Sequence, residues 1–304
     1  MRRWWIPCLW STVCCDGSLK NMTRSPPKKP KFEPLTEVQR AWLRAQAERE
    51  AKPMVSKSFA PTPASSLYSI MQEHTLRNTS SDWREHPEVL TKARVLMVDA
   101  LRAVGVTDER VLMSMGRLPR HVFVDEAFYL RAYHDDALPI GHGQTISHPS
   151  TVARMTALLR AGGGVNKVLE IGTGCGYQAA VLALCVREVY SIERIAPLYN
   201  LAAFNLNQVQ AVLPSMPHLR FGDGMLGWPD AAPFDGIMLA AAGLAIPQVV
   251  LEQLRMGGVL VAPVVVDASA QQHLVRITRV GLNEWQREVF DPVRFVPLLG
   301  GVQD

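Results

Sequence analysis

The chain has 304 residues, of which 48% are hydrophobic and 20% are charged, a composition typical of a chain with a sizeable buried core. No apolar run approaches the roughly 20 residues that a membrane helix needs, so the sequence predicts neither a membrane span nor a membrane partner. The net charge is +4, but residues 1–60 carry +7 and the remainder carries −3, so the main part of the chain lacks the basic excess of a nucleic-acid-binding protein.

The first 85 residues are rich in proline and basic side chains, and they offer few periodic apolar positions. This pattern predicts a disordered basic extension, although 35–51 has the spacing of a short helix. The start, "MRRWWIPCLWSTVCC", is similar to a secretory signal, but Pro7 interrupts its apolar patch and no clear cleavage site follows. Met22 is an alternative start, and on that hypothesis the first 21 residues are an annotation artefact.

Cysteine usage favours a reducing compartment. Three of the five cysteines lie in the first 15 residues, which leaves Cys175 and Cys185 in the main part of the chain. No C-x-x-C pair occurs, so no structural zinc site is predicted and metal is not implied. We therefore expect a cytoplasmic protein.

Two helices are predicted after residue 86. The first helix ends at Gly105, and its apolar residues recur at spacings of three and four, namely Leu90, Ala93, Met97, Leu101 and Val104. For the second helix, Thr107 is a suitable N-cap, acidic residues occupy the first turn, and Pro119 lies beyond the end. These helices predict a small N-terminal layer.

A polar, glycine-containing segment, "ALPIGHGQTISHPSTVARM", spans 137–155. A helix is predicted from Pro149, and either Ser147 or His148 is positioned to cap it. Capping alone explains Ser147, but it does not explain why Gly141 and Gly143 stand beside so many amide and hydroxyl groups. The alternative to a purely structural role is a functional site that uses these groups.

From Lys167 onward, short apolar strands alternate with helices, which predicts a mostly parallel sheet with helices on both faces. Two final segments, 273–280 and 285–298, are predicted as antiparallel edge strands. The other predicted strands are 167–171, 188–192, 219–223, 235–241 and 259–266, and the predicted helices are 176–185, 195–209 and 246–255.

Three glycines follow the first of these strands: Gly172, Gly174 and Gly176. They let a ligand approach the backbone closely, although a tight turn alone would also use them. A dinucleotide site would need its third glycine at position 177, which is tyrosine, so an NAD-dependent oxidoreductase is disfavoured. Glu170 precedes the first glycine, where an acid would repel a pyrophosphate and attract an ammonium group.

Two further acids end the next strands. Glu193 is suited to accept hydrogen bonds from both ribose hydroxyls, and Asp223 to accept one from an adenine amino group. Each acid alone is typical of a solvated strand end. Together, three acids beside a glycine turn indicate a pocket for a positively charged nucleoside without phosphate, and S-adenosylmethionine is such a molecule.

The blocks "ALPIGHGQTIS", "VLEIGTGCGYQAAVLA", "SIER", "GDG" and "RFVPL" resemble the protein-L-isoaspartate O-methyltransferase family in order and spacing across about 88–300. The glycine block alone is typical of the wider methyltransferase superfamily. The loop that ends at Ser147 narrows the resemblance to the protein-L-isoaspartate O-methyltransferase family. Two places depart from the family pattern, Gly243 where proline is expected and the looser "AGGGVN". The resemblance implies a Rossmann-like methyltransferase domain over 86–304.

The resemblance also implies the site. Ser147 would be the active-site serine, and Gln144, Thr145 and Ile146 would bind the substrate. S-adenosylmethionine would be bound by Glu170, Gly172, Gly174, Gly176, Glu193, Asp223 and Gly224, with Gln272 as a further candidate.

The implied reaction methylates the free carboxyl of L-isoaspartyl residues in damaged proteins and so starts their repair. Such a carboxyl is almost fully ionised at pH 7, so no general base and no catalytic triad is needed. Isoaspartyl proteins and peptides would be the partners of a monomeric enzyme. The alternatives are a methyltransferase with another acceptor, such as a small molecule or RNA, and a binding module without turnover.

Overall fold

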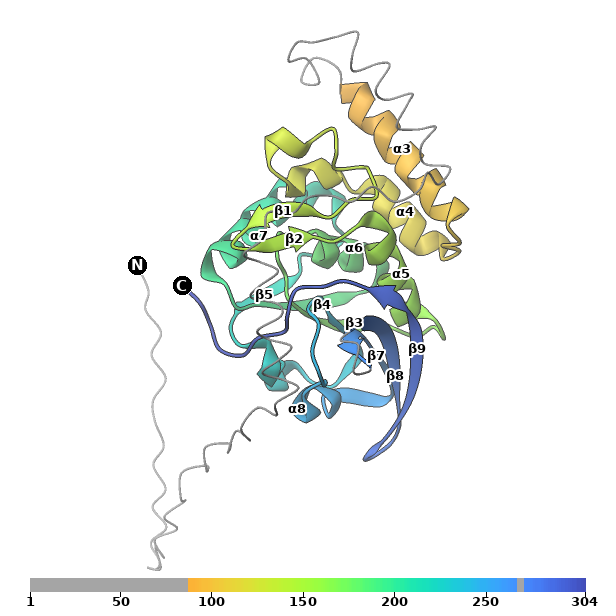
Figure 1. Ribbon diagram of the computed structural model, residues 1–304, viewed down its shortest axis with the longest axis vertical. Helices are drawn as coiled ribbons and strands as arrows, with labels where there is room; N and C mark the ends of the chain where they lie inside the picture. The colour runs from red at the N-terminus through yellow and green to blue at the C-terminus, as the bar shows by residue number, and fades with distance from the viewer. Residues whose placement is uncertain (1–86, 267–270) are drawn as a thin grey trace, which may run out of the picture.

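The computed structural model of the chain describes residues 87–266 and 271–304, and a seven-stranded sheet forms its centre (Figure 1). The strand order is β5-β4-β3-β6-β7-β8-β9, with the first five parallel and the last two antiparallel. The strands are β3 (Lys167–Ile171), β4 (Glu188–Glu193), β5 (His218–Phe221), β6 (Phe234–Leu239), β7 (Leu254–Val265), β8 (Gln272–Gly281) and β9 (Glu284–Val293). The predicted sheet is therefore confirmed.

The chain runs from β3 outward through β4 to β5 and then returns to β6 on the other side of β3. This reversal creates a crevice at the carboxyl ends of β3 and its neighbours, where ligands bind in open parallel sheets. The predictions for 1–85, including the disordered extension and the helix at 35–51, lie outside the described residues.

Helices cover both faces of the sheet. Alternating strand residues divide the core, because Val168 of β3 packs with the cluster of α3 to α6 and Leu169 packs on the opposite face with Val250 of α8. The helices are α3 (Pro87–Ala103), α4 (Glu109–Arg117), α5 (Pro149–Arg160), α6 (Tyr177–Cys185), α7 (Ala196–Gln208) and α8 (Gln248–Leu251). None of the described helices has the length and apolar character of a membrane span.

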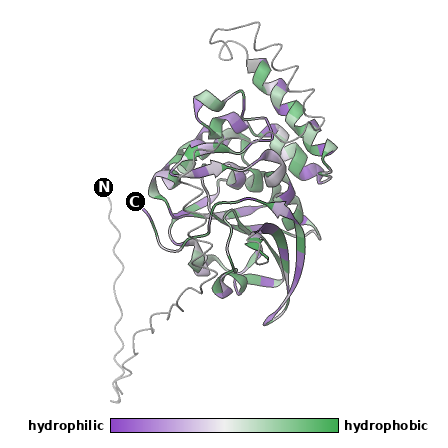
Figure 2. Ribbon diagram, viewed as in Figure 1, coloured by the Kyte–Doolittle hydropathy of each residue, from purple (hydrophilic) through white to green (hydrophobic). Residues whose placement is uncertain are grey.

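The N-terminal layer differs in detail from its prediction. Four of the five predicted apolar positions of α3 are buried, but Val104 lies beyond the helix and is exposed. Figure 2 shows hydrophobic and hydrophilic residues side by side along α3, as expected of an amphipathic helix. Asp108, and not Thr107, caps α4, because its carboxylate accepts from the backbone N–H groups of Arg110 and Val111.

The helix predicted for 246–255 is wrong in extent, since α8 spans four residues. Gln253 explains the early end: its backbone carbonyl accepts from Phe234 N, and its side chain bonds Leu226 O and Trp228 N. These bonds fix a turn at Gln253 where the helix was predicted to continue, and β7 starts at Leu254.

Between α4 and α5 lie two short 3₁₀ turns, η1 (Arg120–Phe123) and η2 (Glu126–Phe128), and a hairpin. The segment predicted as a polar loop is this hairpin, formed by β1 (Leu138–Gly141) and β2 (Gln144–Ile146). His142 and Gly143 form its two-residue turn with φ of 53° and 67°, as a type I′ turn requires.

Candidate functional site

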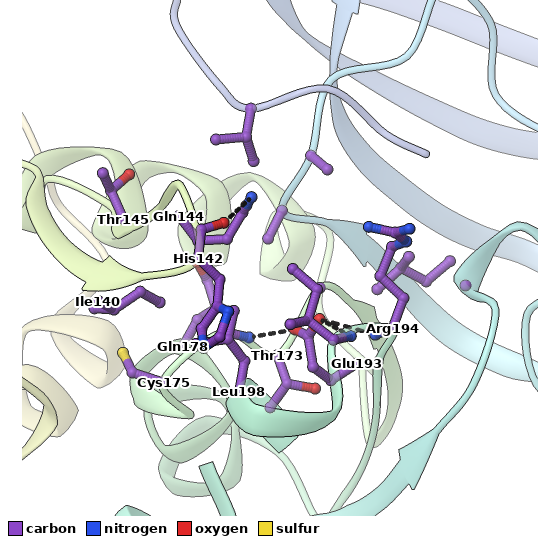
Figure 3. Close-up of a pocket in the computed structure, with 18 of the residues that line it drawn as sticks. Ile140, His142, Gln144, Thr145, Thr173, Cys175, Gln178, Glu193, Arg194 and Leu198 are labelled. Atoms are coloured by element: carbon purple, nitrogen blue, oxygen red, sulfur yellow. Dashed lines mark hydrogen bonds between the residues drawn. The ribbon is translucent and has the colours of Figure 1, made fainter. Parts of the chain in front are cut away.

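A cavity of about 260 Å³ opens at the carboxyl ends of β3, β4 and β6. Figure 3 shows His142, Gln144 and Thr145 of the hairpin on one side of it and Glu193 and Arg194 on another. Most of its wall comes from four segments that are distant in sequence: 142–147, 172–175, 192–195 and 296–299. The hairpin and the glycine turn therefore face one shared space.

Two of the three predicted glycines line the cavity. Gly172 and Gly174 have φ of 97° and 56°, and a Cβ on Gly174 would lie 3.3 Å from the Ile140 side chain. Gly176, with φ of 91°, does not line the cavity, because it packs against α7, where a Cβ would lie 3.3 Å from Ala202 O. Its requirement for glycine is one of helix packing.

Glu193 ends β4 at the cavity wall, and its side chain is 3% exposed. One carboxylate oxygen accepts from Gly174 N at 2.8 Å, and the other accepts from Arg194 N at 2.8 Å and Ile195 N at 2.9 Å. The carboxylate thus ties the glycine turn to the end of β4 and adds negative charge to that wall.

Glu170 is buried behind the glycine turn and is not among the residues that line the cavity. Ser191 Oγ lies 2.5 Å from its Oε2 and 2.6 Å from Thr173 Oγ1, so Glu170 supports the turn through a chain of hydroxyls. Burial raises the pKa of the Glu170 carboxyl to about 8. Its burial and its raised pKa favour an indirect role for this acid behind the glycine turn over a direct attraction to an ammonium group in the cavity.

The high pKa of Glu170 predicts a pH-dependent stability. The folded protein holds this proton up to about pH 8, whereas the unfolded chain releases it near pH 4.5, so stability falls as pH rises between these values. Glu170→Gln is expected to remove this slope, which is at most about 1.4 kcal/mol per pH unit for one proton. Thermal unfolding at pH 5, 6.5 and 8 measures it.

Glu188→Gln, at the partly exposed start of β4, is the control and should keep the wild-type slope. Parallel pH curves for Glu170→Gln and the wild type would contradict the high pKa.

Gly224 lines the cavity, and a Cβ there would overlap the Ile171 side chain. Its neighbour Asp223 does not line the cavity. One Asp223 oxygen caps the 3₁₀ turn η4 (Gly224–Leu226) by accepting from Met225 N, and the other accepts from Gly301 N at 2.7 Å. The acid therefore anchors the C-terminal segment to the end of β5.

The C-terminal segment forms a wall that sequence reasoning did not assign. Figure 1 shows it running from β9 across the sheet towards β5. Leu298 N donates to Ala242 O at 2.7 Å, and Gln303 bonds Arg194 and Ala196 through its backbone. The weaker candidate Gln272 does not line the cavity, because its amide bonds both backbone groups of Phe295.

Ser147 directly follows β2 and lines the cavity, and the residue is half-buried. The predicted substrate-binding residues Gln144, Thr145 and Ile146 line the cavity as well. Neither Ser147 nor His148 caps α5 through its side chain; Asp135 does so by accepting from Ser150 N at 2.8 Å. The capping explanation for Ser147 is therefore wrong, and its hydroxyl forms no hydrogen bond within the described residues.

Arg120 lies behind Ser147 and was not predicted. It is fully buried, and its Nη2 donates to Ser147 O at 2.6 Å. Its guanidinium carbon lies 4.6 Å from the ring centre of Tyr177, a cavity-lining residue at the start of α6.

Within the described residues no group of three or more potential metal ligands occurs.

A sequence model of the family "Protein-L-isoaspartate(D-aspartate) O-methyltransferase" matches residues 92–303. The chain is 54% identical over 211 residues to a protein-L-isoaspartate O-methyltransferase of Burkholderia lata, covering 69% of this chain and 67% of the relative. It is also 54% identical over 212 residues to the protein of that name from Bordetella avium, covering 70% and 78%.

Two solved structures are similar to the described fold. One is a protein-L-isoaspartate O-methyltransferase with a TM-score of 0.61 and 25% identity, and the match covers 69% of this chain and 67% of that one. The other, from Plasmodium falciparum in complex with S-adenosyl-L-homocysteine, has a TM-score of 0.59 and 22% identity, and the match covers 68% and 98%.

Proposed function

The chain belongs to the protein-L-isoaspartate O-methyltransferase family, and from this we propose how its cavity divides between a methyl donor and a methyl acceptor. The enzyme transfers a methyl group from S-adenosylmethionine to the free carboxyl of L-isoaspartyl residues, the step that starts their repair to aspartate. Its fold is the Rossmann-like fold of methyltransferases that use S-adenosylmethionine.

The donor side consists of Gly172, Gly174, Gly224 and Glu193. The glycines support this assignment because Gly172, Gly174 and Gly224 line the cavity and, having no side chain, leave its backbone open to a ligand. A carboxylate on the wall suits ribose hydroxyls and a sulfonium, and it disfavours a pyrophosphate. We assign Glu170, Gly176 and Asp223 supporting roles behind this wall, since none of them lines the cavity.

The acceptor side consists of Ser147 with Gln144, Thr145 and Ile146. When bound, S-adenosylmethionine supplies a methyl group that is already activated by its positive sulfur. A carboxylate oxygen forms the bond to the methyl carbon as the carbon–sulfur bond breaks, so opposite charges disappear and no proton moves. The Ser147 hydroxyl donates to the acceptor carboxylate and orients it, and the hairpin excludes competing water.

The observation that carries this proposal is the polar hairpin, which faces the glycine turn across one cavity. The test is transfer of tritiated methyl to an isoaspartyl peptide and to its aspartyl twin of the same sequence. Methylation of the isoaspartyl peptide alone is expected. Equal labelling of both peptides, or labelling of a small molecule or RNA instead, would contradict the assigned acceptor.

We further propose that the enzyme acts as a monomer in the cytoplasm on isoaspartyl proteins and peptides, without a nucleic-acid or membrane partner. Cys175 and Cys185 are free thiols, which is compatible with a reducing compartment.

We also propose that 86–304 is the complete catalytic unit. The family match starts at residue 92, and the cavity is lined by residues from Ile140 to Gln303. A chain that starts at residue 86 is expected to methylate an isoaspartyl peptide about as fast as the full chain, and limited proteolysis of the full chain should leave an active fragment of this size. Aggregation or inactivity of the shorter chain would contradict the prediction.

A further inference from the structure

Arg120 is a buried cation without a buried anion beside it. The residue is 0% exposed, and within the described residues it forms no ion pair. Burying a guanidinium in this way is unfavourable unless its hydrogen bonds are satisfied, and replacing buried ionic groups by apolar side chains of similar volume is often neutral or stabilising. Its presence therefore calls for an explanation beyond core packing.

The hydrogen bonds of Arg120 join two separate segments. Nε donates to Ala132 O at 2.7 Å, and Nη2 donates to Ser147 O at 2.6 Å. Only the planar fork of a guanidinium can reach two carbonyls in fixed relative positions. One side chain thus holds the end of β2 against the segment that follows η2.

The guanidinium carbon of Arg120 also lies over the Tyr177 ring, 4.6 Å from its centre. Tyr177 begins α6 directly after the glycine turn, so this contact reaches the donor side of the cavity. Arg120 and Tyr177 are both fully buried. Arg120 is therefore hydrogen-bonded to the acceptor segment and also in contact with the first residue of the helix on the donor side.

We propose that Arg120 is a positioning residue that sets Ser147 at a fixed distance from the glycine turn. The proposal rests on the proposed function, in which Ser147 faces the acceptor. In-line methyl transfer depends steeply on the distance and angle between the acceptor oxygen and the methyl carbon. A loosened Ser147 segment would therefore slow transfer, whereas the donor would still be bound by the glycine turn and Glu193.

Arg120→Lys tests this, because lysine keeps the charge but cannot bond both carbonyls in the same fork. The value of kcat/KM for an isoaspartyl peptide is expected to fall about 10- to 100-fold, the range for loss of one charge-assisted hydrogen bond. The Kd of S-adenosylhomocysteine should stay within about twofold of the wild type. A merely structural role would not lower kcat/KM while leaving this affinity unchanged. Hydrogen exchange should quicken in 144–150 and stay unchanged in 167–184.

Arg276→Lys is the matched control, because Arg276 also donates to two backbone carbonyls, Leu158 O and Ala161 O, away from the cavity. It should change thermal stability without changing kcat/KM. Arg120→Met, of similar volume, is a second variant in case the lysine variant does not fold.

Unchanged kcat/KM in a folded Arg120 variant would overturn the proposal. So would a loss of activity matched by an equal loss of S-adenosylhomocysteine affinity, or failure of both variants to fold. Failure of the wild type to methylate the peptide would instead overturn the proposed function.

Discussion

Replacing Glu193 by alanine is expected to weaken binding of S-adenosylmethionine about 100-fold or more, which corresponds to the loss of two hydrogen bonds to a charged group. The carboxylate accepts from three backbone N–H groups and lines the cavity where we propose that the ribose binds. Its removal therefore takes away ligand contacts and also frees Gly174 from the end of β4. Calorimetric titration with S-adenosylhomocysteine measures the effect.

Glu193→Gln separates these two contributions. Its amide keeps the shape of the side chain and one acceptor oxygen, so an intermediate affinity is expected. Glu188→Ala, on the same strand but away from the cavity, should bind normally. A folded Glu193→Ala protein with wild-type affinity would remove Glu193 from the donor site.

Ser147→Ala is expected to have the opposite effect, namely slower methyl transfer with unchanged affinity for the donor. The value of kcat/KM for an isoaspartyl peptide should fall about 10- to 150-fold, because one hydrogen bond to the acceptor carboxylate, of about 1.5–3 kcal/mol, is lost. The affinity for S-adenosylhomocysteine and the melting temperature should stay unchanged, because the hydroxyl forms no hydrogen bond within the described residues and does not cap α5.

Ser150→Ala is the matched control, since Ser150 lies three residues further along, does not line the cavity and is held through its backbone by Asp135. It should turn over normally. A Ser147→Ala protein that melts at a lower temperature but turns over normally would mean that Ser147 is structural.

The residues closest to each other in sequence were the most predictable. The prediction for β3 matches its observed bounds, and Gly172, Gly174 and Glu193 line the cavity, because a strand followed by a glycine turn fixes its own geometry. Ser147 also lines the cavity, in the block that the family resemblance identified. Asp223 could not be assigned in this way. Its carboxylate accepts a hydrogen bond from the backbone N–H of Gly301, 78 residues away, and no local sequence pattern predicts that contact.

Burial and distant hydrogen bonds account for the other differences. Glu170 looks like a strand-end acid in the sequence, but strand alternation turns its side chain into the interior, where it reaches Ser191. Arg120 looks like a surface cation, because arginine is mostly exposed in proteins, and its role depends on a carbonyl 27 residues away. Neither property has a signal in a single sequence.

The central claim is that one cavity holds the methyl donor against the glycine turn and the acceptor against the hairpin. A crystal structure of the chain with S-adenosylhomocysteine and an isoaspartyl peptide tests this most directly. We expect the ribose hydroxyls at Glu193, the sulfur between the glycine turn and the hairpin, and the isoaspartyl carboxylate within hydrogen-bond distance of the Ser147 hydroxyl. A nucleoside outside this cavity, or a peptide carboxylate that does not approach Ser147, would contradict the account.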